Sequence, residues 1–353
     1  MPTDKRLYRF NALLFLVLVL IAGQKSAYSF DSPQTKTASA ISSLEQEVRA
    51  DMNFLANDEL RGRGSATRDE HVVALFAASQ FQSLGLEPGG DNETYLQKAQ
   101  LPDPLPPVLQ HHLSKYEDVP RKETWNAIGI LRGSSRPEEV ILLTAHLDHL
   151  GVSAAAQGDP IYNGADDDAS GTTAVLTLAH LLTSGPRPER TIIFALFGSE
   201  EIGGFGNRAF LAHPPAPLSS IVANLEFEMI GRPDSAVPAG TLWFTGFDRS
   251  NLGPELAKHG AHLVNDPHPK EQFFQRSDNY ALARQGIIAH TVSSFGLHRD
   301  YHEPSDEIGT IDFTHMTHAI QSMVDPIRWL ADSSFKPAWN PGANPQTNPP
   351  PSH

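Results

Sequence analysis

The sequence contains no cysteine. This absence excludes disulfides, thiol chemistry and attachment of a lipid to a cysteine at an export cleavage site. An exported protein without disulfides must be stable through core packing or bound metal alone, which suits a periplasm or the exterior of a bacterium.

An excess of positive charge is also absent. The chain has 27 Lys and Arg residues against 41 Asp and Glu residues, a formal net charge of −14. Such acidity argues against nucleic acid or an anionic membrane surface as a partner. It suits a protein that concentrates divalent cations, although a solvated acidic surface is the commoner cause.

Long hydrophobic runs are scarce, and the longest one lies near the N-terminus. Basic residues precede the apolar run 12–22, and Ala27-Tyr28-Ser29 offers a small-x-small cleavage site. This order is typical of a secretory signal peptide, which we assign to residues 1–29. The run is shorter than the roughly 20 residues that span a bilayer. We therefore expect an exported protein, periplasmic or secreted, with no membrane contact after cleavage.

Composition divides the rest of the chain into three parts. Residues 30–43, rich in Ser, Thr and Ala, are expected to form a flexible leader, and the Pro- and Asn-rich residues 334–353 a disordered tail. Residues 44–333 are long enough for one large domain. No internal repeat is apparent.

Hydrophobic periodicity alternates between strand and helix patterns along that domain. Apolar runs predict strands at residues 125–131, 139–144, 191–197, 221–230, 242–245 and 287–292. Helical spacing predicts helices at residues 43–60, 69–84, 251–259 and 313–332. The first two strands are expected to form a hairpin around Gly133. This order of elements indicates an α/β fold, a three-layer α/β/α domain with helices on both faces of one sheet.

The stretch 140–176 carries the densest chemistry. His146 and Asp148 follow an apolar strand and lie two residues apart, so both point to the same face of an extended chain. The three aspartates 166–168 come one loop later, just before a helical pattern. Carboxylates at this place occupy the edge where open α/β sheets bind ligands. Alone, three aspartates would indicate a polar turn; after His-x-Asp they indicate a metal site.

Metal-binding residue types recur at further strand ends. Their order is His-x-Asp, Asp, Glu-Glu, Glu and His, supplied by His146 with Asp148, Asp167, Glu200 with Glu201, Glu228, and His302. Each alone is weak evidence, because solvated Glu pairs and structural histidines are common. Together they form a mixed nitrogen and oxygen set that suits Zn²⁺, with Mn²⁺ and Co²⁺ as alternatives.

These segments resemble metallopeptidase family twenty-eight, the co-catalytic di-zinc exopeptidases that include bacterial leucyl aminopeptidases and glutamate-carboxypeptidase-like enzymes. The resemblance extends from about Leu44 to Leu330 and is densest in TAHLDHLG, NGADDDASGTTAVL, FALFGSEEIG, NLEFEMIGR, QRSDNYALARQGI and YHEPSDE. It implies a central mixed, mostly parallel sheet of the zinc-exopeptidase, phosphorylase/hydrolase-like kind. It also implies a peptide substrate and two Zn²⁺ ions per chain.

The resemblance gives each candidate ligand a place. One zinc would be held by His146 and Glu228, and the other by Glu201 and His302. Asp167 would bridge both ions.

The resemblance also implies a mechanism. Two cations about 3.5–4 Å apart lower the pKa of a shared water and polarise the scissile carbonyl. Glu200 would be the general base that takes the proton from that water and passes it to the leaving amine. Asp148 would fix the tautomer of His146. The family often has a cis peptide after its bridging aspartate, which in this chain would be the Asp167–Asp168 bond.

Three positions depart from the family pattern. Phe274 stands where the aminopeptidases have a tyrosine on the oxyanion side, so Arg276 or Tyr301 would have to supply that donor. Glu228 stands where many relatives have Asp, which alters the site for a substrate α-amine. Asn279 replaces the histidine of a Ser-Asp-His motif, at a position outside the five ligands.

We therefore predict an exported zinc exopeptidase, either an aminopeptidase or a dipeptidase. A carboxypeptidase of the same family stays open, because the anchor for an amine or a carboxylate depends on loop geometry. A glutaminyl-cyclase-like acyltransferase would use a single zinc, which five ligand positions argue against. A non-enzymatic, receptor-like relative would have lost ligands, and none is lost. His298 is an alternative ligand to His302, and His149 is expected either behind the ligands or at the rim of the site.

Overall fold

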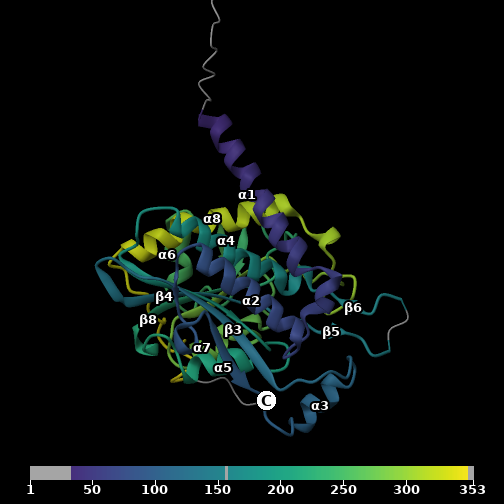
Figure 1. Cartoon of the computed structure of the whole chain (residues 1–353). Coiled ribbons are helices and arrows are strands. Elements are labelled where there is room, and N and C mark those ends of the chain that lie inside the picture. Colours follow the sequence, from purple (N-terminus) through teal and green to yellow (C-terminus); the bar gives the residue numbers. More distant parts are fainter. Residues whose placement is uncertain (1–32, 156–157, 349–353) are drawn as a thin grey trace, which may run out of the picture. The chain divides into compact units, whose positions relative to one another are not determined.

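The computed structural model describes residues 33–155 and 158–348 (Figure 1). The chain forms two compact units, Met1–Ala40 and Ile41–His353, and the second holds the sheet and its helices. The expected signal peptide, residues 1–29, lies outside the described residues. Helix α1 runs over Pro33–Leu55, so the segment expected to be a flexible leader is helical from Pro33 onward. Proline is well tolerated at the first position of a helix, and no breaker follows it in this segment.

A nine-stranded sheet forms the centre of the second unit (Figure 1). The strand order is β1-β3-β7-β4-β8-β11-β9-β10, with β2 paired to β3. The strands are β1 (Glu87–Pro88), β2 (Leu96–Gln100), β3 (Glu123–Leu131), β4 (Arg136–His146), β7 (Arg190–Phe197), β8 (Ile221–Phe227), β9 (Leu242–Phe244), β10 (Leu263–Asn265) and β11 (Ala289–Ser293). Strands β7, β4, β8 and β11 are parallel, whereas β3 and β9 are antiparallel to their inner neighbours. The predicted mixed, mostly parallel sheet is confirmed.

The predicted hairpin between residues 125–131 and 139–144 is wrong. These residues belong to β3 and β4, but β7 lies between the two strands, antiparallel to β3 and parallel to β4. Every residue of β7 is buried, so this strand needs a partner on each edge. Its insertion satisfies that need, and a local turn signal at Gly133 could not reveal it.

Helices cover both faces of the sheet. Successive side chains of β4 point to opposite faces, so they join different core clusters. Ile141 and Leu143 join the larger core cluster, together with helices α2 (Arg68–Ser83), α4 (Gly171–Thr183), α6 (Leu252–Lys258) and α8 (Phe313–Asp332). Leu142 joins a second cluster, with helices α5 (Phe205–Ala212) and α7 (Asp278–Ala283). The predicted three-layer arrangement is therefore present.

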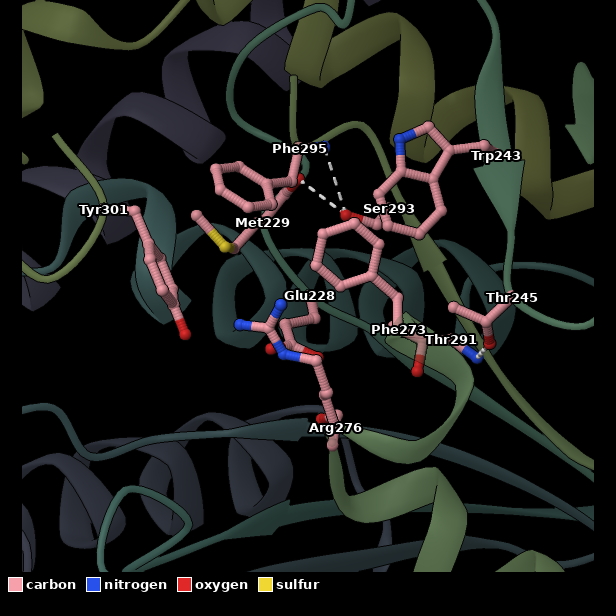
Figure 2. Close-up of a pocket in the computed structure, with 11 residues that line it drawn as sticks. Glu228, Met229, Trp243, Thr245, Phe273, Arg276, Thr291, Ser293, Phe295 and Tyr301 are labelled. Atoms are coloured by element: carbon pink, nitrogen blue, oxygen red, sulfur yellow. Dashed lines mark hydrogen bonds between the residues drawn. The ribbon is translucent and has the colours of Figure 1, made fainter. Parts of the chain in front are cut away.

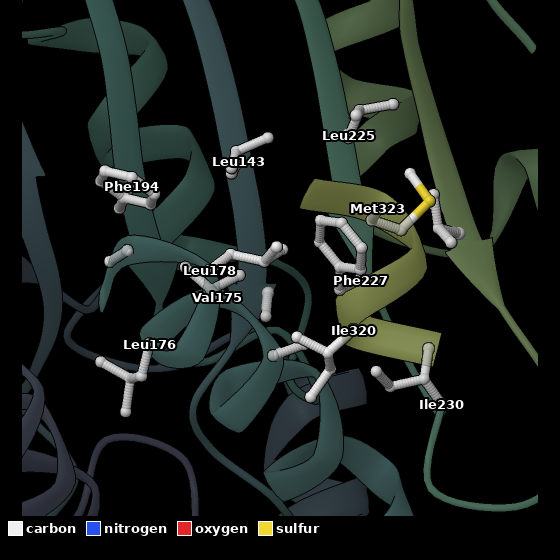
Figure 3. Close-up of a cluster of buried hydrophobic side chains, with 14 of the residues drawn as sticks. Leu143, Val175, Leu176, Leu178, Phe194, Leu225, Phe227, Ile230, Ile320 and Met323 are labelled. Carbon is white, nitrogen blue, oxygen red and sulfur yellow. The ribbon is translucent and has the colours of Figure 1, made fainter. Parts of the chain in front are cut away.

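The larger cluster fixes the position of α4. Figure 3 shows Val175 and Leu178 of α4 near Ile320 and Met323 of α8, with Phe227 at the end of β8. All five side chains are fully buried, and burial of each stabilises the fold by about 1.5–3 kcal/mol. Because α4 cannot shift without losing these contacts, the aspartate loop that precedes it is held against the sheet.

Smaller elements surround this core. Helix α3 (Pro107–Leu113) follows the proline-rich segment 101–107, and β5 (Gly151–Val152) pairs with β6 (Ile161–Tyr162). Among the residues that the structure describes, no helix is long and apolar enough to cross a membrane.

Residues 334–348 pack against the rest of the second unit. Nη2 of Arg190 donates to the carbonyl of Phe335 at 2.8 Å, and Nε1 of Trp339 donates to the carbonyl of Gly286 at 3.1 Å. Composition predicts disorder for residues 334–353, yet residues 334–348 are packed in this way. Two aromatic anchors, Phe335 and Trp339, outweigh the surrounding Pro and Asn residues.

Candidate metal centre

Three parallel strands end at one edge of the sheet, and predicted site residues lie there. β4 ends at His146, the turn after β7 carries Glu200 and Glu201, and Glu228 directly follows β8. The carboxyl ends of parallel strands meet at the same edge, which is where such sheets bind ligands.

Asp167 lies between two histidines at this edge. Its Oδ1 is 3.2 Å from Nε2 of His146, and its Oδ2 is 3.1 Å from Nε2 of His302. The same Nε2 of His302 is 3.2 Å from Oε2 of Glu201. Potential ligand atoms within 4.8 Å of one another form two groups, His146 with Asp167 and Glu228, and His149 with Asp167 and Glu201. The five predicted ligands thus come together, and Asp167 belongs to both groups.

The chemistry of these residues fits a metal ion. Burial and the carboxylate of Asp167 raise the pKa of Glu228 to about 7, and burial raises the pKa of Glu200 well above its ordinary value. Burial also disfavours the charge on Glu201, but His302 and His149 hold the pKa of that carboxyl at about 2. A bound cation would neutralise this crowding of carboxylates, and zinc takes a mixed imidazole and carboxylate set.

Asp148 supports the site in a different way from the one expected. Its carboxylate accepts hydrogen bonds from the hydroxyl of Ser65 at 2.5 Å and from the backbone N–H groups of Glu200 at 2.9 Å and Glu201 at 3.4 Å. Nδ1 of His146 lies 3.1 Å from the backbone carbonyl of Asp148, whereas the carboxylate Oδ1 is 3.8 Å away. The main chain of Asp148 therefore orients His146, while its side chain holds the turn that carries Glu200.

The loop that carries the three aspartates 166–168 is held in place by the side chain of Asp168. The carboxylate of Asp168 accepts hydrogen bonds from the backbone N–H groups of His146 at 3.3 Å, Gly171 at 2.9 Å and Met229 at 3.1 Å. It thereby joins the loop to the ends of β4 and β8. The Asp167–Asp168 peptide bond is cis, as the family resemblance predicted.

Asp306 also holds this loop, and the sequence pattern did not single it out. Its carboxylate accepts hydrogen bonds from the backbone N–H groups of Asp166 at 3.0 Å and Asp167 at 3.0 Å. Asp306 follows His302 by four residues in the segment YHEPSDE. The only available signal was therefore this acidic residue in a segment already assigned to the site.

Arg63 is a second residue that the sequence pattern did not reveal. This arginine is buried, and its guanidinium donates to four backbone carbonyls, those of Leu55 (2.8 Å), Leu147 (3.1 Å), Gly164 (3.0 Å) and Asn163. It therefore ties the end of α1 to the loops that carry His149 and Asp167. Nothing in the polar sequence ELRGRGS indicates that this arginine is buried.

The two further histidines have different environments. His149 is fully buried, and its Nδ1 lies 2.8 Å from Oε1 of Glu201. The second ligand group contains His149 and not His302, although Nε2 of His302 lies 3.1 Å from Asp167 and 3.2 Å from Glu201. His298, the alternative ligand, lies 2.9 Å from Oδ2 of Asp166 through its Nε2. The structure thus places His149 directly against a predicted ligand and His298 against Asp166.

The residues considered for the oxyanion side lie in different surroundings. Phe274 is buried among Tyr280, His290 and Trp339, away from the ligand groups. Tyr301 stacks on the ring of His302 with centroids 3.9 Å apart. Burial and the nearby carboxylates of Asp167 and Glu201 raise the pKa of Tyr301 above its ordinary value, so its hydroxyl keeps its proton.

A pocket opens beside Glu228. Aromatic rings and Met229 form its apolar part, and Trp243 stacks on Phe273 with centroids 5.3 Å apart. Figure 2 shows the hydroxyl of Tyr301 and the guanidinium of Arg276 on the same side of this pocket as Glu228. The complete lining is Glu228, Met229, Trp243, Thr245, Phe273, Arg276, Ser277, Thr291, Ser293, Phe295 and Tyr301.

Comparisons with known proteins agree with this geometry. A vacuolar membrane protease of Clavispora lusitaniae is 27% identical over 336 residues, which cover 92% of this chain and 30% of the relative. Carboxypeptidase Q of Bos taurus is 29% identical over 137 residues, which cover 38% of this chain and 26% of the relative. The chain thus spans about a third or less of the length of these curated relatives. The solved structure of BSAP, a zinc aminopeptidase from Bacillus subtilis, covers 82% of this chain and 95% of its own at a TM-score of 0.59 and 17% identity, and shows the same fold.

The predicted localisation is contradicted by these relatives. Export to a periplasm or the exterior was inferred from residues 1–29 alone, which lie outside the described residues. Matched relatives from Clavispora lusitaniae, Candida tropicalis and Candida glabrata are all named vacuolar membrane protease. A basic segment followed by a short apolar run does not by itself distinguish export from other membrane-directed routes, so that inference was too specific.

The family resemblance inferred from the motifs is confirmed. A sequence profile of Peptidase family M28 matches residues 126–325, which include all five predicted ligands and Glu200. Because this profile matches residues 126–325 of the 353-residue chain, the chain belongs to peptidase family M28.

Proposed function

We propose that this chain is a zinc-dependent aminopeptidase that binds two zinc ions and releases an apolar or aromatic residue from the N-terminus of a peptide. One ion would be held by His146 and Glu228, the other by Glu201 and His302, with Asp167 shared. The shared position of Asp167 supports two ions rather than one. Zinc at this place would supply a Lewis acid that polarises the scissile carbonyl and acidifies the attacking water.

Glu200 is the residue proposed to move the proton. Glu200 is partly buried, and its backbone N–H is held by the carboxylate of Asp148 at 2.9 Å. Burial and the surrounding carboxylates raise the pKa of Glu200, so it binds a proton more tightly than an ordinary carboxylate does, which suits a general base. Glu200 would take the proton from the attacking water and deliver it to the leaving amine.

Tyr301 is proposed as the donor to the carbonyl oxygen. Its ring is fixed by stacking on His302, and its hydroxyl keeps its proton beside the ligand carboxylates. A neutral hydroxyl placed in advance stabilises the charge that develops on the carbonyl oxygen. Phe274 cannot serve this purpose because its side chain has no hydrogen-bond donor, and it is packed in the core.

The observation that carries the substrate assignment is the apolar pocket beside Glu228. A peptide whose first carbonyl lies at the ligand groups would place its first side chain among Trp243, Phe273 and Phe295. Its α-amine would meet carboxylates, since Glu228 lines the pocket. Of the described residues that line the pocket, only Arg276 is cationic, and its Nη1 already lies 3.6 Å from Oε2 of Glu271. This charge balance favours an amine over a carboxylate.

Hydrolysis of leucyl- and phenylalanyl-p-nitroanilide tests the proposal, with the N-acetylated compounds as matched controls. We expect release from the free amines only, loss of release after chelation, and about two zincs per chain by elemental analysis. Cleavage of N-blocked peptides from the C-terminus would instead indicate a carboxypeptidase that uses Arg276 as anchor. One zinc per chain with cyclisation of N-terminal glutamine would indicate a cyclase.

A further inference from the structure

The turn that carries Glu200 adopts an unfavourable backbone conformation. Ser199 directly precedes Glu200 and has a φ of 57°, in the left-handed region that side chains other than glycine seldom adopt. Such a conformation persists only where surrounding contacts determine it. Ser199 is fully buried, so those contacts must come from within the protein.

A buried carboxylate on α2 supplies one of them. Glu70 is fully buried, and its Oε2 accepts hydrogen bonds from the hydroxyl of Ser199 at 2.9 Å and the backbone N–H of Ala66 at 2.7 Å. Its Oε1 accepts from the hydroxyl of Thr124 at 2.7 Å and the backbone N–H of Trp125 at 3.3 Å. One side chain thus joins the start of α2, strand β3 and the turn after β7.

The turn is held from two sides. The carboxylate of Asp148 binds the backbone N–H of Glu200, whereas Glu70 binds the side chain of Ser199. Glu201 has additional fixed contacts of its own, with Nδ1 of His149 at 2.8 Å and Nε2 of His302 at 3.2 Å. Loss of the Glu70 contact should therefore displace Glu200 more than Glu201.

We infer that Glu70 is a positioning residue for Glu200, and that it acts through the hydroxyl of Ser199. Glu70 does not reach the substrate, since two backbone N–H groups and two hydroxyls occupy its carboxylate. The inference rests on the proposed role of Glu200 as the base. A displacement of about 1 Å at a reacting group can cost about 100-fold in rate, so this remote contact should affect turnover.

The substitution Glu70→Gln tests the inference with little change in shape. An amide nitrogen cannot accept a hydrogen bond, so in either orientation it would face the N–H of Ala66 or that of Trp125. Ser199→Gly removes the hydroxyl together with its Cβ, and glycine adopts the positive φ without strain. Thr124→Val is the matched control, because it removes a hydrogen bond to the other oxygen of Glu70 and leaves the hydrogen bond between Ser199 and Glu70 in place.

We expect Ser199→Gly to lower kcat by about 10- to 100-fold, with KM changed less than about twofold and zinc content unchanged. Glu70→Gln should lower kcat by the same factor or less, because its remaining oxygen can still accept from Ser199 in one orientation of the amide. The double variant should be no slower than Ser199→Gly, because that change already removes the contact through which Glu70 acts. Thr124→Val should keep the wild-type kcat even if its melting temperature falls. If the substitutions acted only by destabilising the fold, the melting temperature of all three variants would fall, and kcat would not distinguish Thr124→Val from the other two.

Several results would overturn the inference. These are a zinc-loaded Ser199→Gly protein with wild-type kcat, an equal loss of kcat in Thr124→Val, or additive losses in the double variant. If Glu70→Gln does not fold, Ser199→Gly decides alone, since its loss of kcat is still required. Glu200→Gln separates the two proposals: if it stays active, the proposed base is wrong, whereas an inactive Glu200→Gln beside a fully active Ser199→Gly refutes only the role of Glu70.

Discussion

Nε2 of His302 lies 3.1 Å from Oδ2 of Asp167, although one residue comes from the loop before α8 and the other from the loop before α4. This contact places His302 beside the residue that both ligand groups share. We predict that His302→Asn lowers the zinc content from about two to about one per chain. Activity should fall more than about 100-fold, the upper range for residues that only support metal ligands.

The matched control is His298→Asn. His298 lies four residues earlier in the same loop but contacts Asp166 instead of the ligand groups. Both zincs should be retained in that variant. Loss of zinc from His298→Asn, with retention in His302→Asn, would reverse the assignment of the two histidines. Elemental analysis of the purified variants gives the answer directly.

The donor to the carbonyl oxygen can be identified by two substitutions. Tyr301→Phe removes only the hydroxyl, so we expect kcat to fall by about 100-fold with KM and zinc content nearly unchanged. Arg276→Met should change KM instead, because Arg276 lines the pocket with Glu228 and pairs with Glu271. Steady-state kinetics on leucyl-p-nitroanilide separates the two effects.

Tyr280→Phe provides the control for that hydroxyl. Tyr280 packs against Phe274 in the second core cluster and does not line the pocket. Its kcat should equal that of the wild type. If Arg276→Met shows the larger loss in kcat, the donor is Arg276 and the assignment to Tyr301 fails.

Stability of the metal-free protein should depend on pH through Glu228. Burial and the carboxylate of Asp167 raise the pKa of this carboxyl from 4.5 to about 7 in the folded protein. The folded state then binds the proton more tightly than the unfolded state, so the free energy of unfolding decreases as pH rises from about 4.5 to about 7. Asp278, whose pKa burial raises to about 6, adds to the same trend.

Zinc should reverse this dependence. A cation favours the ionised ligands, so zinc binds more tightly as pH rises and stabilises the folded state by mass action. Urea denaturation of the chelated and zinc-loaded proteins between pH 4.5 and 7.5 checks the prediction. Glu228→Gln should make the slope of the metal-free protein smaller without abolishing it, because burial also raises the pKa of Glu70 to about 8 and that of Asp51 to about 7. If the free energy of unfolding of the metal-free protein instead increases with pH, protonation of buried Glu228 does not control its stability.

The strand ends explain why the clustering of the candidate ligands could be predicted and the contacts that support them could not. His146, Glu201 and Glu228 each follow an apolar run, so local pattern and the sheet rule place them at one edge. Asp306 and Arg63 act through backbone groups far along the chain, at Asp167 and Leu147 for example. No local pattern records such contacts.

The predicted hairpin failed for a related reason. Turn residues near Gly133 are a local signal, whereas the insertion of β7 between β3 and β4 depends on burial of a distant strand. The helix 313–332 was predicted with its observed bounds, because apolar spacing alone determines it. Elements set by their own periodicity were thus predictable, and pairings set by competition among strands were not.

Arg63 offers the last prediction, since it joins α1 to both loops of the site. Its guanidinium donates to four carbonyls, and lysine carries its three donors on one nitrogen that cannot reach them all. Arg63→Lys should lower the free energy of unfolding by about 3 kcal/mol or more, because buried carbonyls lose their partners. Arg61→Lys is the control: Arg61 is nearly half exposed and pairs with Glu117, so the loss should stay within about 1 kcal/mol. Urea denaturation of the two zinc-loaded variants measures both values. If Arg63→Lys is as stable as Arg61→Lys, the loops are held by the ligands and Asp306, and the buried guanidinium is not what fixes them.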